Sequence, residues 1–226
     1  MSGPAAVLFD LDGTLIDSED LWWEAECRTV ATWSGTWTRD DQAHCLGGPL
    51  ERVTAYMAER TSSPKTPADI GEQLLSTMEA LLRSGQLEWR PGALALLNEC
   101  RRAGVATALV SASYRRLLDA VADAVSGHPG MSHPAFDVTV AGDEVANGKP
   151  HPEPYAHAAR RLGVDIADCI VIEDSPTGVA SGQASGAFVV AVPHIVHVPD
   201  APRRRVVASL EGVSLDDLRT WVNLAQ

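Results

Sequence analysis

Short, continuous apolar runs recur along the chain, with longer amphipathic segments between them. The first run, residues 5–9, lacks polar alternation, which is typical of a parallel strand buried on both faces. Similar runs predict further strands at 105–110, 137–141, 169–172 and 187–192, the last of which we expect to be the final strand. Helical spacing predicts helices between them, at 93–103, 114–125, 153–162 and 177–185. This alternation predicts an α/β fold built on a Rossmann-like, doubly wound parallel sheet.

A long helical stretch interrupts this alternation directly after the first predicted strand. Residues 17–60 and 67–83 carry apolar side chains at helical spacing, with a loop at Gly47, Gly48 and Pro49. Residues 87–92 are expected to form a connector. We therefore predict two domains, an α/β core of residues 1–17 and 87–226 and an inserted all-helical cap of residues 18–86. An insert that leaves the sheet at the carboxyl end of a strand is well placed to act as a lid.

Composition narrows the classes of function. The chain has 226 residues, 45% of them hydrophobic, with a formal net charge of −12. Nucleic acids and anionic membranes select basic surfaces, so we expect neither as a partner. The four cysteines form no CxxC pair, and no apolar stretch is long enough to span a membrane. These features favour a cytoplasmic protein with reduced thiols, and we expect a monomer or weak dimer.

Polar residues follow four of the predicted strands, at the ends where parallel sheets bind ligands. Asp10 and Asp12 follow the first strand, and an i, i+2 pair in extended chain projects to one side. Ser111, Lys149 and Asp174 follow later strands. Three carboxylates without histidine or cysteine suit Mg²⁺, whereas a lysine and hydroxyls can hold phosphate oxygens. Together they predict phosphoryl transfer through a carboxylate nucleophile.

Each of these residues also has a plain structural interpretation. A single Asp-x-Asp pair is often a turn or helix cap, and Ser111 or Glu173 with Asp174 could cap the helix that follows. Lys149 could be a solvated loop charge, but Lys65 and Lys149 are the only lysines in an arginine-rich chain. The convergence of four strand ends favours the functional interpretation over the separate structural ones.

The four segments resemble the four motifs of the haloacid dehalogenase superfamily, in order and in spacing. They are Asp10-Leu11-Asp12-Gly13-Thr14-Leu15, Val110-Ser111-Ala112-Ser113, Gly148-Lys149-Pro150 and Ile172-Glu173-Asp174-Ser175. The chain is similar in particular to the subgroup of beta-phosphoglucomutase and small sugar-phosphate phosphatases, which carries a helical cap after the first motif. The resemblance covers nearly the whole chain.

The resemblance implies a role for each matching residue. Asp10 would be the nucleophile and a metal ligand, and Asp12 the general acid and base, with its backbone carbonyl also on the metal. Asp174 would complete a Mg²⁺ site, with Glu173 in support. Residues implied to hold the phosphoryl group are Ser111, Ala112 and Lys149, supported by Thr14. The implied reaction is hydrolysis of a small phosphorylated metabolite through an aspartyl phosphate on Asp10.

Departures from the resemblance separate the alternatives. Dehalogenases lack the second aspartate, which is present here as Asp12. Phosphonatases form a Schiff base with a cap lysine, whereas the only lysine of the predicted cap, Lys65, lies in a Ser-Ser-Pro-Lys-Thr-Pro loop. The related mutases have a histidine in the first cap helix, where this chain has Trp22. A phosphatase is therefore favoured, with a phosphosugar mutase or a catalytically silent binding protein as alternatives.

Weaker signals lie outside the motifs. Glu19 and Arg52 are candidate substrate contacts in the predicted cap. His194 and His197 could form a metal pair, but no third ligand lies near them in the sequence. Residues 203–205, three consecutive arginines, are expected to form a solvated turn.

Overall fold

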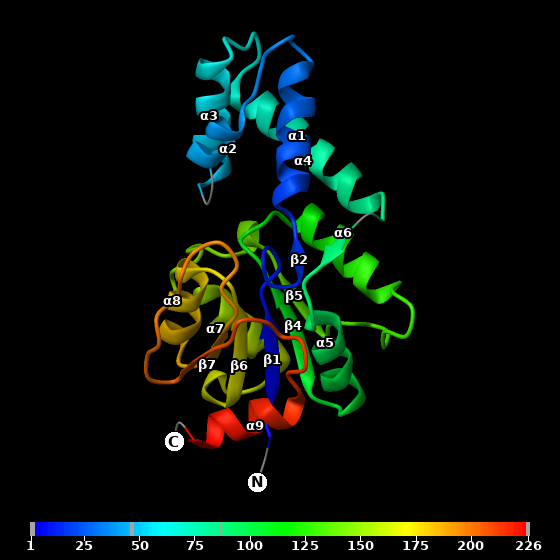
Figure 1. Cartoon of the computed structure of the whole chain (residues 1–226), viewed down its shortest axis with the longest axis vertical. Helices are drawn as coiled ribbons and strands as arrows, with labels where there is room; N and C mark the ends of the chain where they lie inside the picture. Colours follow the sequence, from blue (N-terminus) through cyan, green and yellow to red (C-terminus); the bar gives the residue numbers. More distant parts are fainter. Residues whose placement is uncertain (1–2, 46–47, 86, 225–226) are drawn as a thin grey trace. The chain divides into compact units, whose positions relative to one another are not determined.

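A computed structural model of the chain describes residues 3–45, 48–85 and 87–224. The chain divides into two compact units. One comprises Met1–Asp17 and Leu87–Gln226, and the other comprises Ser18–Gln86. The first unit contains the sheet, and the second is helical throughout its described elements (Figure 1).

The α/β unit is built on a six-stranded parallel sheet. Its strands lie in the order β5 (Val138–Val140), β4 (Ala106–Val110), β1 (Ala6–Phe9), β6 (Cys169–Glu173), β7 (Phe188–Ala191) and β8 (Arg204–Val206). β1 lies near the middle and pairs with β4 on one side and β6 on the other. Side chains of β1 are fully buried, as the unbroken apolar run predicts. The prediction of a doubly wound α/β core with a helical insert is confirmed.

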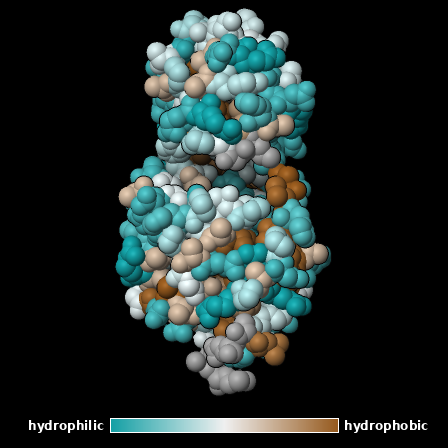
Figure 2. Space-filling model, turned by 90° about the vertical axis from the view of Figure 1, so that its left-hand side faces the viewer, coloured by the Kyte–Doolittle hydropathy of each residue, from teal (hydrophilic) through white to brown (hydrophobic). Residues whose placement is uncertain are grey.

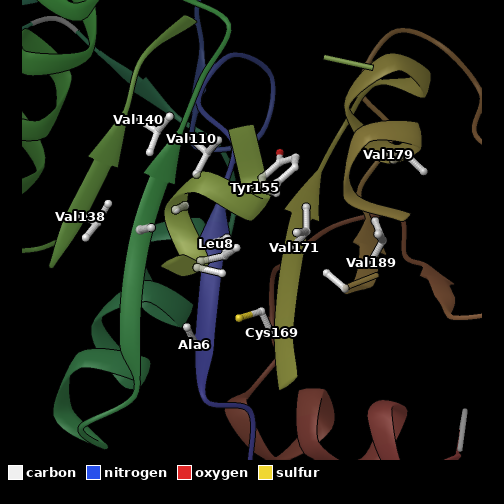
Figure 3. Packing of buried hydrophobic residues seen from close by; sticks show 14 of the residues in the cluster. Ala6, Leu8, Val110, Val138, Val140, Tyr155, Cys169, Val171, Val179 and Val189 are labelled. Atoms are coloured by element: carbon white, nitrogen blue, oxygen red, sulfur yellow. The ribbon is translucent and has the colours of Figure 1, made fainter. Parts of the chain in front are cut away.

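Helices lie on both faces of this sheet, as Figure 1 shows. They are α5 (Ala93–Arg102), α6 (Arg115–Ser126), α7 (Glu153–Leu162), α8 (Pro176–Ser185) and α9 (Leu215–Leu224), with short 3₁₀ turns at Gly142–Glu144 and Ile166–Asp168. α7 contacts β1, β4 and β5, whereas α8 contacts β6 and β7. The side chains between these two helices and the sheet form one buried cluster, which includes Leu8, Val110, Val171 and Tyr155 (Figure 3).

Three elements of the α/β unit differ from the sequence prediction. Residues 87–92 are more than a connector, because β3 (Glu88–Trp89) pairs antiparallel with β2 (Ile16–Asp17). Residues 204–206 form edge strand β8 where a solvated turn was expected, so 187–192 does not hold the final strand. α9 was not predicted. β3 and β8 are stabilised by backbone pairing with a neighbouring strand rather than by burial on two faces. Their sequences therefore carry no apolar run that would predict a strand.

In the described residues of the helical unit, the helices are α1 (Glu19–Ala31), α2 (Arg39–Cys45), α3 (Leu50–Arg60) and α4 (Pro67–Arg83). α4 contacts both α1 and α3. Its N-terminus is capped by Thr66, whose side chain accepts a hydrogen bond from the Asp69 N–H. Met57, Ile70 and Met78 are buried in this unit. Of the predicted glycine loop, Gly48 and Pro49 precede α3, and Gly47 lies outside the described residues.

Polar side chains dominate the surface seen in Figure 2, in keeping with the net charge of −12. Large hydrophobic side chains that are exposed in the described parts of the chain are Ile195, Val196 and Leu224. Among the helices of the described residues, none combines the length and apolar character needed to cross a membrane.

Candidate active site

The registers of the central strands bring Asp10 and Glu173 side by side. Phe9 of β1 pairs with Ile172 of β6, so the residues that follow them in the two strands are neighbours. The Asp10 N–H donates to the Ile172 carbonyl at 3.0 Å. Alternation along each strand decides which way they point. Asp10 continues the face of Ala6 and Leu8, and Glu173 continues that of Cys169 and Val171, all four of which belong to the cluster beneath α7 and α8.

Lys149 joins this pair from the loop before α7. Its Nζ lies 2.6 Å from Asp10 Oδ1 and 2.7 Å from Glu173 Oε1, and it also donates to the Val110 carbonyl at 3.0 Å. The lysine side chain is only 6% exposed. Burial by itself lowers the pKa of Lys149, but attraction to Asp10 and Glu173 outweighs burial, and the pKa lies above its ordinary value. The ammonium group therefore stays charged.

A cluster of carboxylates surrounds the lysine. Oxygens of Asp10, Glu173 and Asp174 all lie within 4.8 Å of one another. Burial, followed by repulsion from Glu173, raises the pKa of Asp10 well above its ordinary value. The same two causes raise the pKa of Asp174 to about 7. The repulsion among these neighbouring carboxylates is therefore larger than the single positive charge of the lysine can offset.

The donor set fits a divalent cation. Three buried or half-buried carboxylates supply hard oxygen ligands, which Mg²⁺ prefers, and a cation would relieve the repulsion that raises the pKa values. Gly13 leaves room for this arrangement, since a Cβ there would lie 2.2 Å from Asp174 Oδ2, and its φ of +83° favours glycine. The cluster can therefore hold a metal ion, as predicted for Asp10 and Asp174.

Glu173 is held in place by many donors. Its Oε1 accepts from Lys149 and from the Tyr155 hydroxyl, whereas its Oε2 accepts from the Asp174 and Ser175 N–H groups and the Ser175 hydroxyl. Gly178 of α8 closes over it, and a Cβ there would clash with the carboxylate. The sequence indicated Glu173 only as a supporting residue. Tyr155 was missed, because nothing in the predicted helix 153–162 shows where its hydroxyl points.

Asp12 lies with the serines that follow β4. The Ser113 hydroxyl donates to Asp12 Oδ2 at 2.9 Å, and that of Ser111 lies 3.4 Å from the same oxygen. The Ser113 N–H in turn donates to the Ser111 hydroxyl at 2.9 Å. The structure thus brings Asp12 and Ser111 together, as the strand-end prediction requires, and adds Ser113. Ala112, between the serines, is exposed.

The remaining candidates are not members of the carboxylate cluster. The Thr14 hydroxyl is buried and has no hydrogen-bond partner among the described residues. His194 Nε2 lies 3.1 Å from Asp17 Oδ2, and His197 is exposed; neither belongs to a three-ligand metal group in the described chain. Glu19 and Arg52 lie in the helical unit, on α1 and α3.

A carboxylate cluster with a buried lysine, placed at the carboxyl ends of parallel strands, defines an α/β enzyme of the phosphoryl-transfer or related hydrolytic class. Comparisons with known proteins identify the family. The haloacid dehalogenase-like hydrolase family matches residues 4–186. Hexitol phosphatase A of Escherichia coli is 34% identical over 223 residues, which cover 92% of each chain. Protein CbbY of Rhodobacter capsulatus is 32% identical over 196 residues, covering 83% of this chain and 85% of that protein.

A solved structure agrees with these matches. CbbY from Rhodobacter sphaeroides, in a D10N mutant form bound to xylulose-(1,5)bisphosphate, superposes with a TM-score of 0.82 at 29% identity, covering 95% of this chain and 99% of that one. The chain belongs to the haloacid dehalogenase-like hydrolase family. The resemblance found in the four sequence motifs is confirmed, as is the prediction of a hydrolase of this family.

Proposed function

We propose that the chain is a Mg²⁺-dependent phosphatase that hydrolyses a phosphomonoester of a small metabolite through an aspartyl phosphate on Asp10. The observation that carries this proposal is the position of Lys149 Nζ, 2.6 Å from Asp10 Oδ1 beside the carboxylate cluster. A nucleophilic carboxylate, a fixed cation and a metal-binding donor set are the parts that phosphoryl transfer needs. The match to a hexitol phosphatase over 92% of both chains supports the same chemistry.

The reaction proceeds in two displacements. Asp10 attacks phosphorus, the ester P–O bond breaks, and protonated Asp12 gives its proton to the departing alkoxide. Asp12, now a carboxylate, takes a proton from water, whose oxygen attacks phosphorus and releases Asp10 and inorganic phosphate. Lys149 and the Ser111 hydroxyl hold the phosphoryl oxygens in both steps. Mg²⁺ held by Asp10, Asp174 and the Asp12 carbonyl would neutralise charge on those oxygens.

A sugar phosphate is the substrate class that the comparisons support best. One relative is a hexitol phosphatase, and another was solved with a pentulose bisphosphate. Both ligand classes are polyhydroxylated chains carrying phosphate. We assign the same class to this chain, with the helical unit of residues 18–86 acting as a cap that selects the sugar, through Glu19 and Arg52 among other groups.

The test is a screen of purified protein with Mg²⁺ against a panel of phosphate esters, with release of inorganic phosphate as the readout. Asp10→Asn should remove turnover while leaving the fold intact. Asp168→Asn is the matched control, because Asp168 is an exposed aspartate at the amino end of β6, the opposite end from the site. It should keep wild-type activity.

Three results would contradict the proposal. They are no phosphate release from any ester, unchanged turnover in Asp10→Asn, and conversion of a sugar phosphate to its isomer without net release. The last would indicate a mutase, which the half-buried Trp22 at the mutase histidine position disfavours. Tight ester binding without turnover would indicate a silent binding protein.

A further inference from the structure

Tyr155 is buried against the candidate site from the side of α7. It is 0% exposed, and its hydroxyl donates to Glu173 Oε1 at 2.8 Å. Figure 3 shows the ring nearer the arrowheads of the strands than Leu8, which lies deeper in the same cluster. Lys149 Nζ lies 4.8 Å from the centre of the ring. Burial, and then the charge of Glu173, raises the pKa of Tyr155 well above its ordinary value, so the hydroxyl remains a donor.

Lys149 has no spare donor in this arrangement. An ammonium group has three N–H bonds, and here they meet three acceptors, Asp10 Oδ1, Glu173 Oε1 and the Val110 carbonyl. A phosphoryl oxygen can therefore receive an N–H from Lys149 only by replacing one of these acceptors. Glu173 Oε1 also accepts from the Tyr155 hydroxyl, so it is the acceptor that can keep a side-chain hydrogen bond when the lysine turns away.

Releasing the lysine from Glu173 would normally leave a buried carboxylate oxygen short of a donor, which is costly. The Tyr155 hydroxyl changes this balance, because Glu173 Oε1 is shared between Lys149 and Tyr155. When an N–H of Lys149 turns away, Oε1 still has one donor. The other oxygen, Oε2, keeps its own donors from Asp174 and Ser175 throughout.

We infer that Tyr155 is a positioning residue that frees Lys149 to hold a phosphoryl oxygen, by keeping Glu173 Oε1 hydrogen-bonded when the lysine turns toward the phosphoryl group. The inference rests on the proposed function only in that a phosphoryl group must enter the site. A purely structural tyrosine would affect stability and leave the affinity of the folded protein for phosphate unchanged.

The test is the affinity for inorganic phosphate in the presence of Mg²⁺, measured by calorimetry on Tyr155→Phe and wild type. Loss of one donor to a buried carboxylate should weaken phosphate binding by about tenfold and lower kcat/KM by at least as much. Tyr56→Phe is the matched control, since the Tyr56 hydroxyl also donates to a carboxylate, Asp41 Oδ1, at 2.8 Å in the helical unit. It should lower the melting temperature without changing phosphate affinity.

A double variant separates positioning from structure. Glu173→Gln removes the charge that competes for Lys149, so adding Tyr155→Phe to it should cost no further phosphate affinity. This comparison also decides the matter if the single Tyr155→Phe protein does not fold, because the neutral amide tolerates the lost donor better. A further loss in the double variant would overturn the inference.

Two other results would also overturn it, namely unchanged phosphate affinity in folded Tyr155→Phe and an equal loss in Tyr56→Phe. Absence of phosphate binding by the wild type would do the same. Binding needs no turnover, so failure of the ester screen and failure of this inference are separate results.

Discussion

At the scale of single residues, Asp12 is set apart from the other acids of the site by its partners. Asp10, Glu173 and Asp174 face one another, whereas Asp12 Oδ2 accepts from the Ser113 hydroxyl and lies 3.4 Å from that of Ser111. Serine donors orient the carboxyl group toward β4 without adding charge. This setting suits a group that moves protons rather than one that binds phosphorus.

The proton-transfer role of Asp12 predicts a dependence on the leaving group. Asp12→Asn should lower turnover of a sugar phosphate by about 10²–10⁴-fold, because an alkoxide leaves poorly without a proton. Release of p-nitrophenolate in the first turnover should fall much less, since p-nitrophenolate leaves without protonation, whereas the later hydrolysis of the aspartyl phosphate needs Asp12 as base with either substrate. Single-turnover rates of alcohol release from the two substrates provide the measurement. Equal losses on both would exclude Asp12 as the general acid.

Asp174 predicts a pH dependence of metal binding. Its pKa of about 7 in the metal-free protein is caused by burial and by Glu173, and Mg²⁺ requires the ionised carboxylate. Because the folded pKa is raised, the carboxyl group stabilises the metal-free fold fully below its unfolded pKa, and this contribution is lost as pH rises through about 7. Mg²⁺ binding should show the opposite trend.

The measurement is calorimetric titration of Mg²⁺ between pH 6 and 8. The affinity for Mg²⁺ should fall by about tenfold for each pH unit below 7, because each ion that binds displaces one proton from Asp174. Asp174→Asn should bind Mg²⁺ weakly at every pH. An affinity that does not change across this range would contradict the assignment of Asp174 as a ligand.

Proximity of the motif residues could be predicted from the sequence because it follows from strand order. Asp10, Ser111 and Asp174 each come at the carboxyl end of an apolar run, and parallel strands bring such ends to one edge. The contacts of Ser113 and Tyr155 could not be predicted, since they depend on side-chain directions set by packing. The roles of all these residues stay predictions until tested.

At the scale of elements, the helical unit holds an unusual buried acid. Glu26 of α1 is 5% exposed and accepts from the Trp37 indole N–H at 2.9 Å. Burial raises the pKa of Glu26 to about 7, although the Trp37 hydrogen bond lowers it. Below the pKa that Glu26 has in the unfolded chain, its carboxyl group contributes fully to the stability of the helical unit. This contribution to stability is lost as pH rises through about 7.

Glu26→Gln should therefore raise the free energy of unfolding at pH 8 by about 1–3 kcal/mol and leave it little changed at pH 5. The amide oxygen can still accept from Trp37. Urea denaturation at both pH values provides the measurement. Glu24→Gln, which loses only an exposed pair with Arg28, should change stability by less than about 0.5 kcal/mol at either pH. If Glu26→Gln instead lowers the free energy of unfolding at pH 8, ionisation of the buried Glu26 does not destabilise the fold, and the prediction is wrong.

The elements themselves were predictable where burial decides them. β1 and β6 are unbroken apolar runs, and their burial on both faces follows directly. β3 and β8 are two and three residues long, and both depend on backbone pairing with a strand that the local sequence does not reveal. The three arginines around β8 reinforced the expectation of a solvated turn there.

At the scale of the whole molecule, the α/β unit holds the carboxylate cluster and Lys149, and we propose that the helical unit selects the substrate. Arg52, an exposed arginine of α3, has one N–H bound to the Cys45 carbonyl at 3.3 Å. Its planar fork suits hydroxyl or phosphate groups of a sugar phosphate.

Arg52→Ala should therefore raise KM for the metabolite found in the screen by about tenfold, and leave turnover of p-nitrophenyl phosphate unchanged. Arg28→Ala, an exposed arginine of α1 paired with Glu24, is the control and should change neither. Steady-state kinetics on both substrates decide the matter. An equal effect of Arg52→Ala on the two substrates would mean that the helical unit does not select the sugar in this way.

The central claim is that Asp10 carries the phosphoryl group during turnover. Borohydride reduces an acyl phosphate to an alcohol, so trapping during hydrolysis with Mg²⁺ present should convert Asp10 to homoserine, which peptide mass spectrometry detects. We expect this conversion only with substrate and only at Asp10, and none in the Asp10→Asn protein. Continued phosphate release with Asp10 unmodified, or modification of another residue, would contradict it.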